Sequence, residues 1–63
     1  MFNLKGARAN AGLTQAQVCK SLNISKTTLR SYEKYKTKPD IDIAKKIASL
    51  YNLSVDDIKW SEG

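Results

Sequence analysis

The chain has 63 residues, a formal net charge of +5, one cysteine and no histidine. This length allows one small domain, predicted over residues 1–63 with its core at 3–60. The composition excludes an internal disulfide and a zinc-ligand set. The chain begins with no signal peptide and holds no apolar run near the roughly 20 residues of a membrane span. We therefore expect a cytoplasmic protein with no cofactor and no membrane or small-molecule partner.

Two helices are predicted in the first third of the chain. The first follows from four residues at the i, i+3, i+4, i+7 spacing of one helical face: Leu4, Ala7, Arg8 and Ala11. Gly12 ends this helix, because glycine tolerates a positive φ. Thr14 caps the second helix, and Gln17, three residues later, completes a capping box. The buried stripe of the second helix includes Cys19, and Asn23 provides a left-handed stop.

Two further helices are predicted across the middle of the chain. Ser25 caps the third helix, which is expected to end near Lys34, and residues 36–39 are expected to form a loop. Asp40 caps the fourth helix and Asn52 stops it. The buried face of the fourth helix is predicted from five residues at helical spacing: Ile41, Ala44, Ile47, Ala48 and Tyr51.

A last short helix is predicted after the fourth. Ser54 and Asp57 have the spacing of a second capping box, and the helix is expected to continue through about Trp60. No segment sustains the alternation of a strand, so the predicted fold class is all-α, a compact bundle of five helices. Trp60 has three open interpretations: a contact between two copies of the chain, packing on its own core, or simple exposure.

Positive charge is concentrated before residue 39. Residues 1–38 carry eight Lys or Arg and one acid, whereas residues 39–63 carry three Lys and five acids. The stretch from Asn23 to Pro39 alone holds four lysines and one arginine against a single acid, Glu33. A small domain with one strongly basic side predicts a polyanionic partner, nucleic acid or an anionic membrane surface, because an ordinary soluble surface mixes both signs.

The second and third predicted helices are joined by Asn23–Ile24–Ser25 alone. Such a short turn holds two helices at a steep angle and leaves the second one protruding. The outward face of the third helix then carries donors and small hydroxyl groups with no acid: Lys26, Thr27, Arg30, Ser31 and Lys34. The major groove of B-DNA admits an α-helix, and such groups hydrogen-bond to base edges. The alternative for Lys26 and Arg30 is an ordinary solvated face.

The stretch GLTQAQVCKSLNISKTTLRSYEKYKTKPDIDIAKKIASLYNLSVDDI resembles the phage repressor and Cro type of helix-turn-helix domain, also called the lambda-repressor-like or XRE family. The similarity runs from about Leu4 to Ile58. It is carried by G-L-T-Q, a small residue at Cys19, Ile24–Ser25 in the turn, Glu33, a K-x-K-P loop, I-A in the fourth helix and L-S-V-D-D-I at the end. The resemblance implies a five-helix bundle whose second and third helices form the helix-turn-helix.

The resemblance also implies roles for individual residues. Base reading falls to residues of the third helix, with Arg30 beside them: Lys26, Thr27 and Ser31. Phosphate binding falls to the start of the second helix, the end of the third and the following loop: Gln15, Lys34, Lys36 and Lys38. Arg8 and Glu33 match a salt bridge between the first and third helices. Tyr35 departs from the family, which usually has glycine after the third helix, and Asn23 replaces the usual turn glycine.

The function expected from these features is sequence-specific binding of double-stranded DNA by a phage or bacterial transcription regulator of Cro or repressor type. The third helix, about 26–34, is expected to enter the major groove of a palindromic operator. A weak homodimer would be completed on the DNA, with Ile58 and Trp60 as the candidate dimer contact. The alternative is a protein-interaction module of the same fold, such as an antitoxin, although only Lys59 to Gly63 remain to cover a toxin. The sequence offers no aromatic platform on which unstacked RNA bases could stack. It also has no histidine, no set of metal ligands and no paired acids, so an enzyme is not expected.

Overall fold

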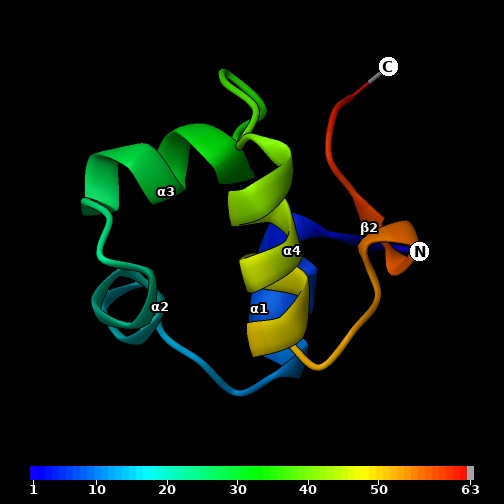
Figure 1. Cartoon of the computed structure of the whole chain (residues 1–63), viewed down its shortest axis with the longest axis horizontal. Coiled ribbons are helices and arrows are strands. Elements are labelled where there is room, and N and C mark those ends of the chain that lie inside the picture. Colours follow the sequence, from blue (N-terminus) through cyan, green and yellow to red (C-terminus); the bar gives the residue numbers. More distant parts are fainter. Residues whose placement is uncertain (63) are drawn as a thin grey trace.

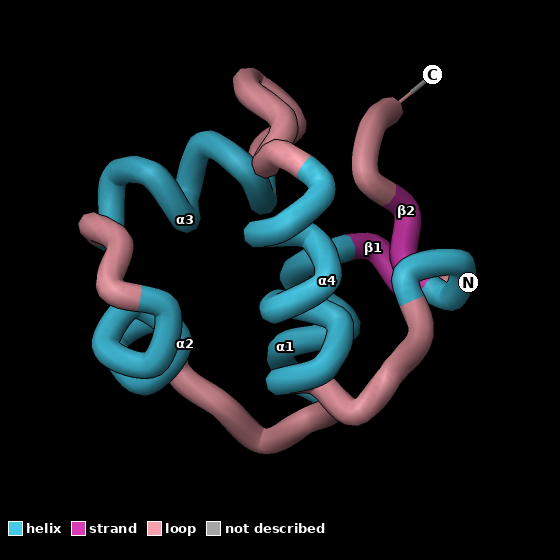
Figure 2. The backbone as a smooth tube through the Cα atoms, viewed as in Figure 1, coloured by secondary structure: helices cyan, strands magenta, loops and turns pink. Residues whose placement is uncertain are grey.

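The computed structural model describes residues 1–62, so Gly63, the last residue of the expected domain, lies outside the described part. Helices make up most of these residues, and two very short strands pair beside them (Figures 1 and 2). The elements in chain order are β1 (Phe2–Asn3), α1 (Leu4–Asn10), α2 (Gln15–Leu22), α3 (Lys26–Glu33), α4 (Ile41–Leu50), a 3-10 turn η1 (Val55–Asp57) and β2 (Ile58–Lys59). In Figure 1, α2 and α3 lie on the left, α4 crosses in front of α1, and β2 lies on the right.

Each α-helix begins at a residue whose side-chain oxygen accepts a backbone N–H of the first turn. The predicted caps are confirmed at Thr14, Ser25 and Asp40, with bonds of 3.2, 3.1 and 2.9 Å to the N–H groups three residues later. The Thr14 box is complete, because Gln17 Oε1 accepts the Thr14 N–H at 2.8 Å. A fourth cap was not predicted: Asn3 Oδ1 accepts the N–H of residue 6 at 2.6 Å. That residue is glycine, and a Cβ there would lie 2.8 Å from the same oxygen.

The helices end at four residues in the left-handed region, where a following N–H reaches back to a carbonyl of the last turn. Gly12, Asn23 and Asn52 have φ values of 73°, 57° and 58°, which confirms the three predicted stops. The fourth residue is Tyr35, with φ 60°. A tyrosine in this conformation carries strain of the order of 1–2 kcal/mol that glycine avoids, so another interaction must hold it there.

The predicted fifth helix is wrong, and so is the exclusion of strands. The Ser54 N–H donates to Asp57 Oδ2 at 3.1 Å, but the helical turn ends at once. Ile58 turns to extended backbone, with φ −115° and ψ 135°, and pairs in parallel register with Phe2. In this extended conformation the Ile58 side chain is 3% exposed and belongs to the core. Long-range burial therefore ends the helix that the local capping signal begins. Within residues 1–62 the fold has four α-helices and one small strand pair rather than five helices.

One core joins all four α-helices and β2. It consists of nine buried residues: Leu4, Ala7, Val18, Cys19, Leu29, Ile47, Ala48, Tyr51 and Ile58. Cys19 is buried, as predicted. Ile41 was predicted on the buried face of α4, and this is wrong: it is 60% exposed, because it is the first residue of the helix and lies beyond the packed turns.

Candidate functional site

The turn between α2 and α3 positions the third helix. Asn23 adopts the left-handed conformation, and the next N–H, that of Ile24, donates to Cys19 O at 3.1 Å. Ser25 is extended and caps α3. Leu29, in the middle of α3, is fully buried and anchors the helix to the core. One face of α3 is therefore fixed against the protein and the opposite face is held out to solvent.

The outward face of α3 carries the predicted base-reading residues. Lys26, Thr27 and Arg30 are exposed, and Ser31 is half-buried. A hollow of about 180 Å³ on this face is lined by Thr27, Arg30, Ser31, Lys34 and Lys36. Thr28 is turned toward the helix start, where its Oγ1 lies 2.9 Å from Ser25 Oγ. The face thus offers hydrogen-bond donors and hydroxyls beside one another, and no carboxylate lines the hollow.

The end of α3 places the lysines of the following loop. The Tyr35 N–H donates to Tyr32 O at 3.1 Å and the Lys36 N–H donates to Ser31 O at 2.9 Å, which is the paired bond pattern of a Schellman ending. Lys34, Lys36 and Lys38 are all exposed around this ending. These three side chains can therefore reach an anion lying along this end of the helix.

The hydroxyl of Tyr35 ties this helix end to both ends of the fold, which the sequence did not reveal. It accepts the Leu4 N–H at 3.2 Å and donates to Lys59 O at 3.1 Å. One side chain thus joins the end of α3 to the start of α1 and to β2. This bridge explains why a tyrosine occupies a left-handed position. The signal in the sequence was the departure itself, a bulky residue where the family has glycine.

A partly buried ionic network links α1, α2 and α3. Arg8 Nε donates to Glu33 Oε2 at 2.7 Å, and Arg8 Nη2 lies 3.4 Å from Glu33 Oε1. Gln15 Nε2 donates to Oε1 of the same carboxylate at 3.1 Å. The side chains of Arg8 and Glu33 are only 14% and 6% exposed, and the bond to Glu33 raises the pKa of Arg8 above its usual value. Arg8 Nη1 also donates to Leu13 O at 3.1 Å, so the network fixes the loop before α2 as well.

Tyr51 lies in the core with its hydroxyl group unbonded within the described residues. Its side chain is among the largest that are fully buried. Burial raises the pKa of Tyr51 to about 12, and the negative charge of Glu33 adds to this while the positive charge of Arg8 opposes it. The phenol therefore stays neutral over the whole physiological range.

The two candidate dimer residues have different places in the fold. Ile58 is 3% exposed and belongs to the core of its own chain. Trp60 is half-buried, packs against that core, and its indole Nε1 donates to Val55 O at 2.9 Å. The indole is thus held by its own chain, and part of its surface is still exposed to solvent. A contact between two copies through Trp60 stays a prediction.

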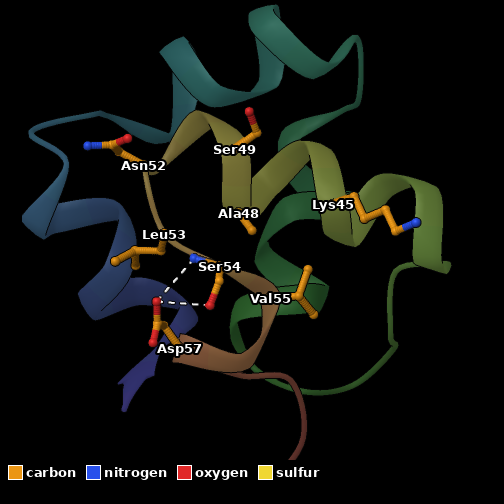
Figure 3. A pocket seen from close by; sticks show the side chains of 8 residues that line it. All are labelled: Lys45, Ala48, Ser49, Asn52, Leu53, Ser54, Val55 and Asp57. Atoms are coloured by element: carbon orange, nitrogen blue, oxygen red, sulfur yellow. Dashed lines mark hydrogen bonds between the residues drawn. The ribbon is translucent and has the colours of Figure 1, made fainter.

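A separate, shallow hollow lies between α4 and η1 (Figure 3). Lys45, Ser49 and Asp57 are among the side chains that line it, and none of the residues lining it belongs to the predicted site. The described residues contain no group of three or more potential metal ligands. None of the helices in residues 1–62 is long and apolar enough to cross a membrane.

Comparison with known proteins agrees with this arrangement. A helix-turn-helix family model matches residues 4–58. The HTH-type transcriptional regulator ImmR of Bacillus subtilis is 43% identical over 53 residues, which cover 84% of this chain and 42% of that protein. An uncharacterized HTH-type transcriptional regulator of Methanocaldococcus jannaschii is 38% identical over 55 residues, covering 87% of this chain and 83% of that protein. The chain spans less than half the length of ImmR. No solved structure gives a significant match.

Proposed function

We propose that this chain, which belongs to the helix-turn-helix family, binds double-stranded DNA as a transcriptional regulator and places α3 in the major groove. The observation that carries the proposal is the exposed face of α3, where donors and hydroxyls surround a hollow without a carboxylate. The helix-turn-helix of this family and the names of its relatives support the same class of activity.

In this proposal the base edges are read by four side chains: Lys26, Thr27, Arg30 and Ser31. Lysine and arginine donate to guanine O6 and N7, and threonine also contacts the thymine methyl group. Lys26 and Thr27 come from the first turn of α3, which is the part of a recognition helix that contacts base edges. Arg30 and Ser31 follow one turn later, so the four side chains can span neighbouring base pairs.

Phosphate binding supplies most of the affinity in this proposal. Its donors flank the reading face at the start of α2, the end of α3 and the loop: Gln15, Lys34, Lys36 and Lys38. Gln15 Nε2 carries two hydrogen atoms, and its bond to Glu33 uses one of them, so the other can donate to a phosphate oxygen. Each neutralised phosphate releases counterions, and binding should weaken steeply with salt.

A palindromic operator requires two copies, because one chain offers one α3. Two reading helices would lie one helical turn of DNA apart, about 34 Å between half-site centres. A weak contact between copies, with Trp60 as its candidate, is sufficient because the two half-sites reinforce each other through effective concentration.

Selection of bound duplexes from a random pool tests the proposal, followed by anisotropy titrations with Lys26→Ala. Two inverted half-sites should be enriched, and Lys26→Ala should relax the preference at one base pair per half-site with a loss of about 1–3 kcal/mol. Lys46→Ala is the matched control, since it removes the same charge from an exposed position of α4. Enrichment of no motif would overturn base reading and favour a protein-interaction module. An equal loss for Lys26→Ala on the selected and random duplexes would reduce Lys26 to a phosphate contact.

A further inference from the structure

A second basic hollow lies on the other side of α3, between this helix and the starts of α1 and α2. Its volume is about 280 Å³, and five residues line it: Lys5, Gln15, Arg30, Glu33 and Lys34. Because a water molecule occupies about 30 Å³ in the liquid, this hollow has space for a phosphate group together with several waters. Lys5 was assigned no role by the sequence, and it is exposed on the first turn of α1.

The charge of this hollow is strongly positive despite the glutamate in its wall. Both Glu33 oxygens are already occupied, Oε2 by Arg8 and Oε1 by Gln15. Within residues 1–62, Arg8 and Glu33 form the one ion pair, so Lys5, Arg30 and Lys34 have no acidic partner there. Three cations from α1 and α3 therefore converge on one concave surface without an anion of the protein to neutralise them.

Arg30 and Lys34 line this hollow and also the hollow on the reading face. The two hollows are therefore neighbours, with the Arg30 and Lys34 side chains between them. Lys36 lines only the reading-face hollow, whereas Lys5 and Gln15 line only the second one. A helix in a groove about 12 Å wide has a DNA strand on each side of it, and each strand presents phosphates to the protein.

We propose that Lys5, Gln15 and Lys34 bind a single backbone phosphate in this second hollow, on the opposite side of α3 from the phosphates met by Lys36. Lys5 is then a phosphate-binding residue that completes the clamp from α1. The inference rests on the proposed DNA binding and deepens it. The ionic network supports this site, because Arg8 fixes Glu33 and Glu33 in turn holds the Gln15 amide at the edge of the hollow.

The test compares Lys5→Ala with Lys46→Ala, which has the same net charge, on a random-sequence duplex from 50 to 200 mM salt. Lys5→Ala should lower the salt slope by about 0.9, so the loss of affinity across this range should be about 3.5-fold smaller than for the parent chain. Lys46→Ala should keep the parent slope, and Lys5→Arg should restore it. Equal melting temperatures for the three variants establish that folding is unchanged.

Phosphate-by-phosphate replacement with neutral methylphosphonate then locates the contact on the duplex. One position should weaken the parent chain and Lys46→Ala more strongly than Lys5→Ala, because only Gln15 and Lys34 still contact that phosphate in Lys5→Ala. Equal slopes for Lys5→Ala and Lys46→Ala would overturn the phosphate site while DNA binding by the parent chain still stood. A parent chain that binds no duplex at all would overturn this inference together with the proposed function.

Discussion

Replacing Arg8 by methionine tests how far one partly buried ion pair holds the helix-turn-helix on the rest of the fold. Methionine keeps much of the aliphatic length of arginine, so the change removes the guanidinium with little loss of packing. Three hydrogen bonds disappear: two of them to Glu33, at 2.7 and 3.4 Å, and one to Leu13 O, at 3.1 Å. The Glu33 carboxylate, whose side chain is 6% exposed, keeps only Gln15 as a donor.

The expected loss follows from this geometry. Removing one partner of a buried pair costs about 3–5 kcal/mol, because the other charge stays buried without compensation. Arg8 retains 14% exposure, which favours the lower end, about 3 kcal/mol. The stability of folded proteins is roughly 0.05–0.15 kcal/mol per residue, which gives about 3–9 kcal/mol for a chain of this size. Arg8→Met should therefore bring the domain close to unfolding at room temperature.

Thermal and urea unfolding followed by circular dichroism measures the effect. A loss of about 3 kcal/mol should lower the melting temperature by at least about 12 °C in a domain of this size. The double variant Arg8→Met/Glu33→Met should recover part of the loss, since apolar residues can replace a buried pair at little cost. The reasoning is refuted if Arg8→Met melts within about 2 °C of the parent chain, or if the two single losses simply add in the double variant.

Two tyrosines give further predictions. Tyr51→Phe should be at least as stable as the parent chain at pH 7, because it removes a buried hydroxyl that has no partner. The folded state raises the pKa of Tyr51 from 10.0 to about 12, so the native chain keeps a proton that the unfolded chain loses. This contribution to the free energy of unfolding, about 2–3 kcal/mol, is fully present below pH 10 and is lost as the pH rises to 12. Urea titrations should show that Tyr51→Phe does not lose this contribution at high pH. Tyr35→Phe should lower the free energy of unfolding by about 1–2 kcal/mol, because two hydrogen bonds disappear. Tyr32→Phe is the control: its hydroxyl makes no hydrogen bond within residues 1–62, so its melting temperature should change little. Equal melting temperatures for the Tyr35 and Tyr32 variants would contradict the bridge between α3 and the strand pair.

The sequence predicted most helix ends that a local interaction sets, with the Asn3 cap of α1 as the exception. The caps at Thr14, Ser25 and Asp40 each join residues three positions apart, so the pattern is visible in a short window of sequence. The stops at Gly12 and Asn52 depend on the backbone preference of one residue. Such signals are readable without knowledge of the tertiary structure.

Most features that the sequence missed depend on partners far along the chain, whereas the Asn3 cap and the exposure of Ile41 at the start of α4 are local. Ile58 ends the last helical turn early because it pairs with Phe2, 56 positions away, and a capping box carries no information about that. The Tyr35 hydroxyl bonds to Leu4, 31 positions earlier in the chain, and to Lys59, 24 positions later. The phosphate role proposed for Lys5 likewise became visible only when α1 was placed beside α2 and α3.

The central claim, that the outward face of α3 reads base edges in the major groove, is tested most directly by methylation interference on a selected duplex. Dimethyl sulfate modifies guanine N7, which lies in the major groove, and adenine N3, which lies in the minor groove, so one reaction probes both sides of the DNA. The account predicts interference at guanine N7 in each half-site, and loss of that interference at one guanine when the Lys26 or Arg30 side chain is truncated to alanine. Interference confined to adenine N3, or a guanine pattern unchanged in both variants, would contradict it.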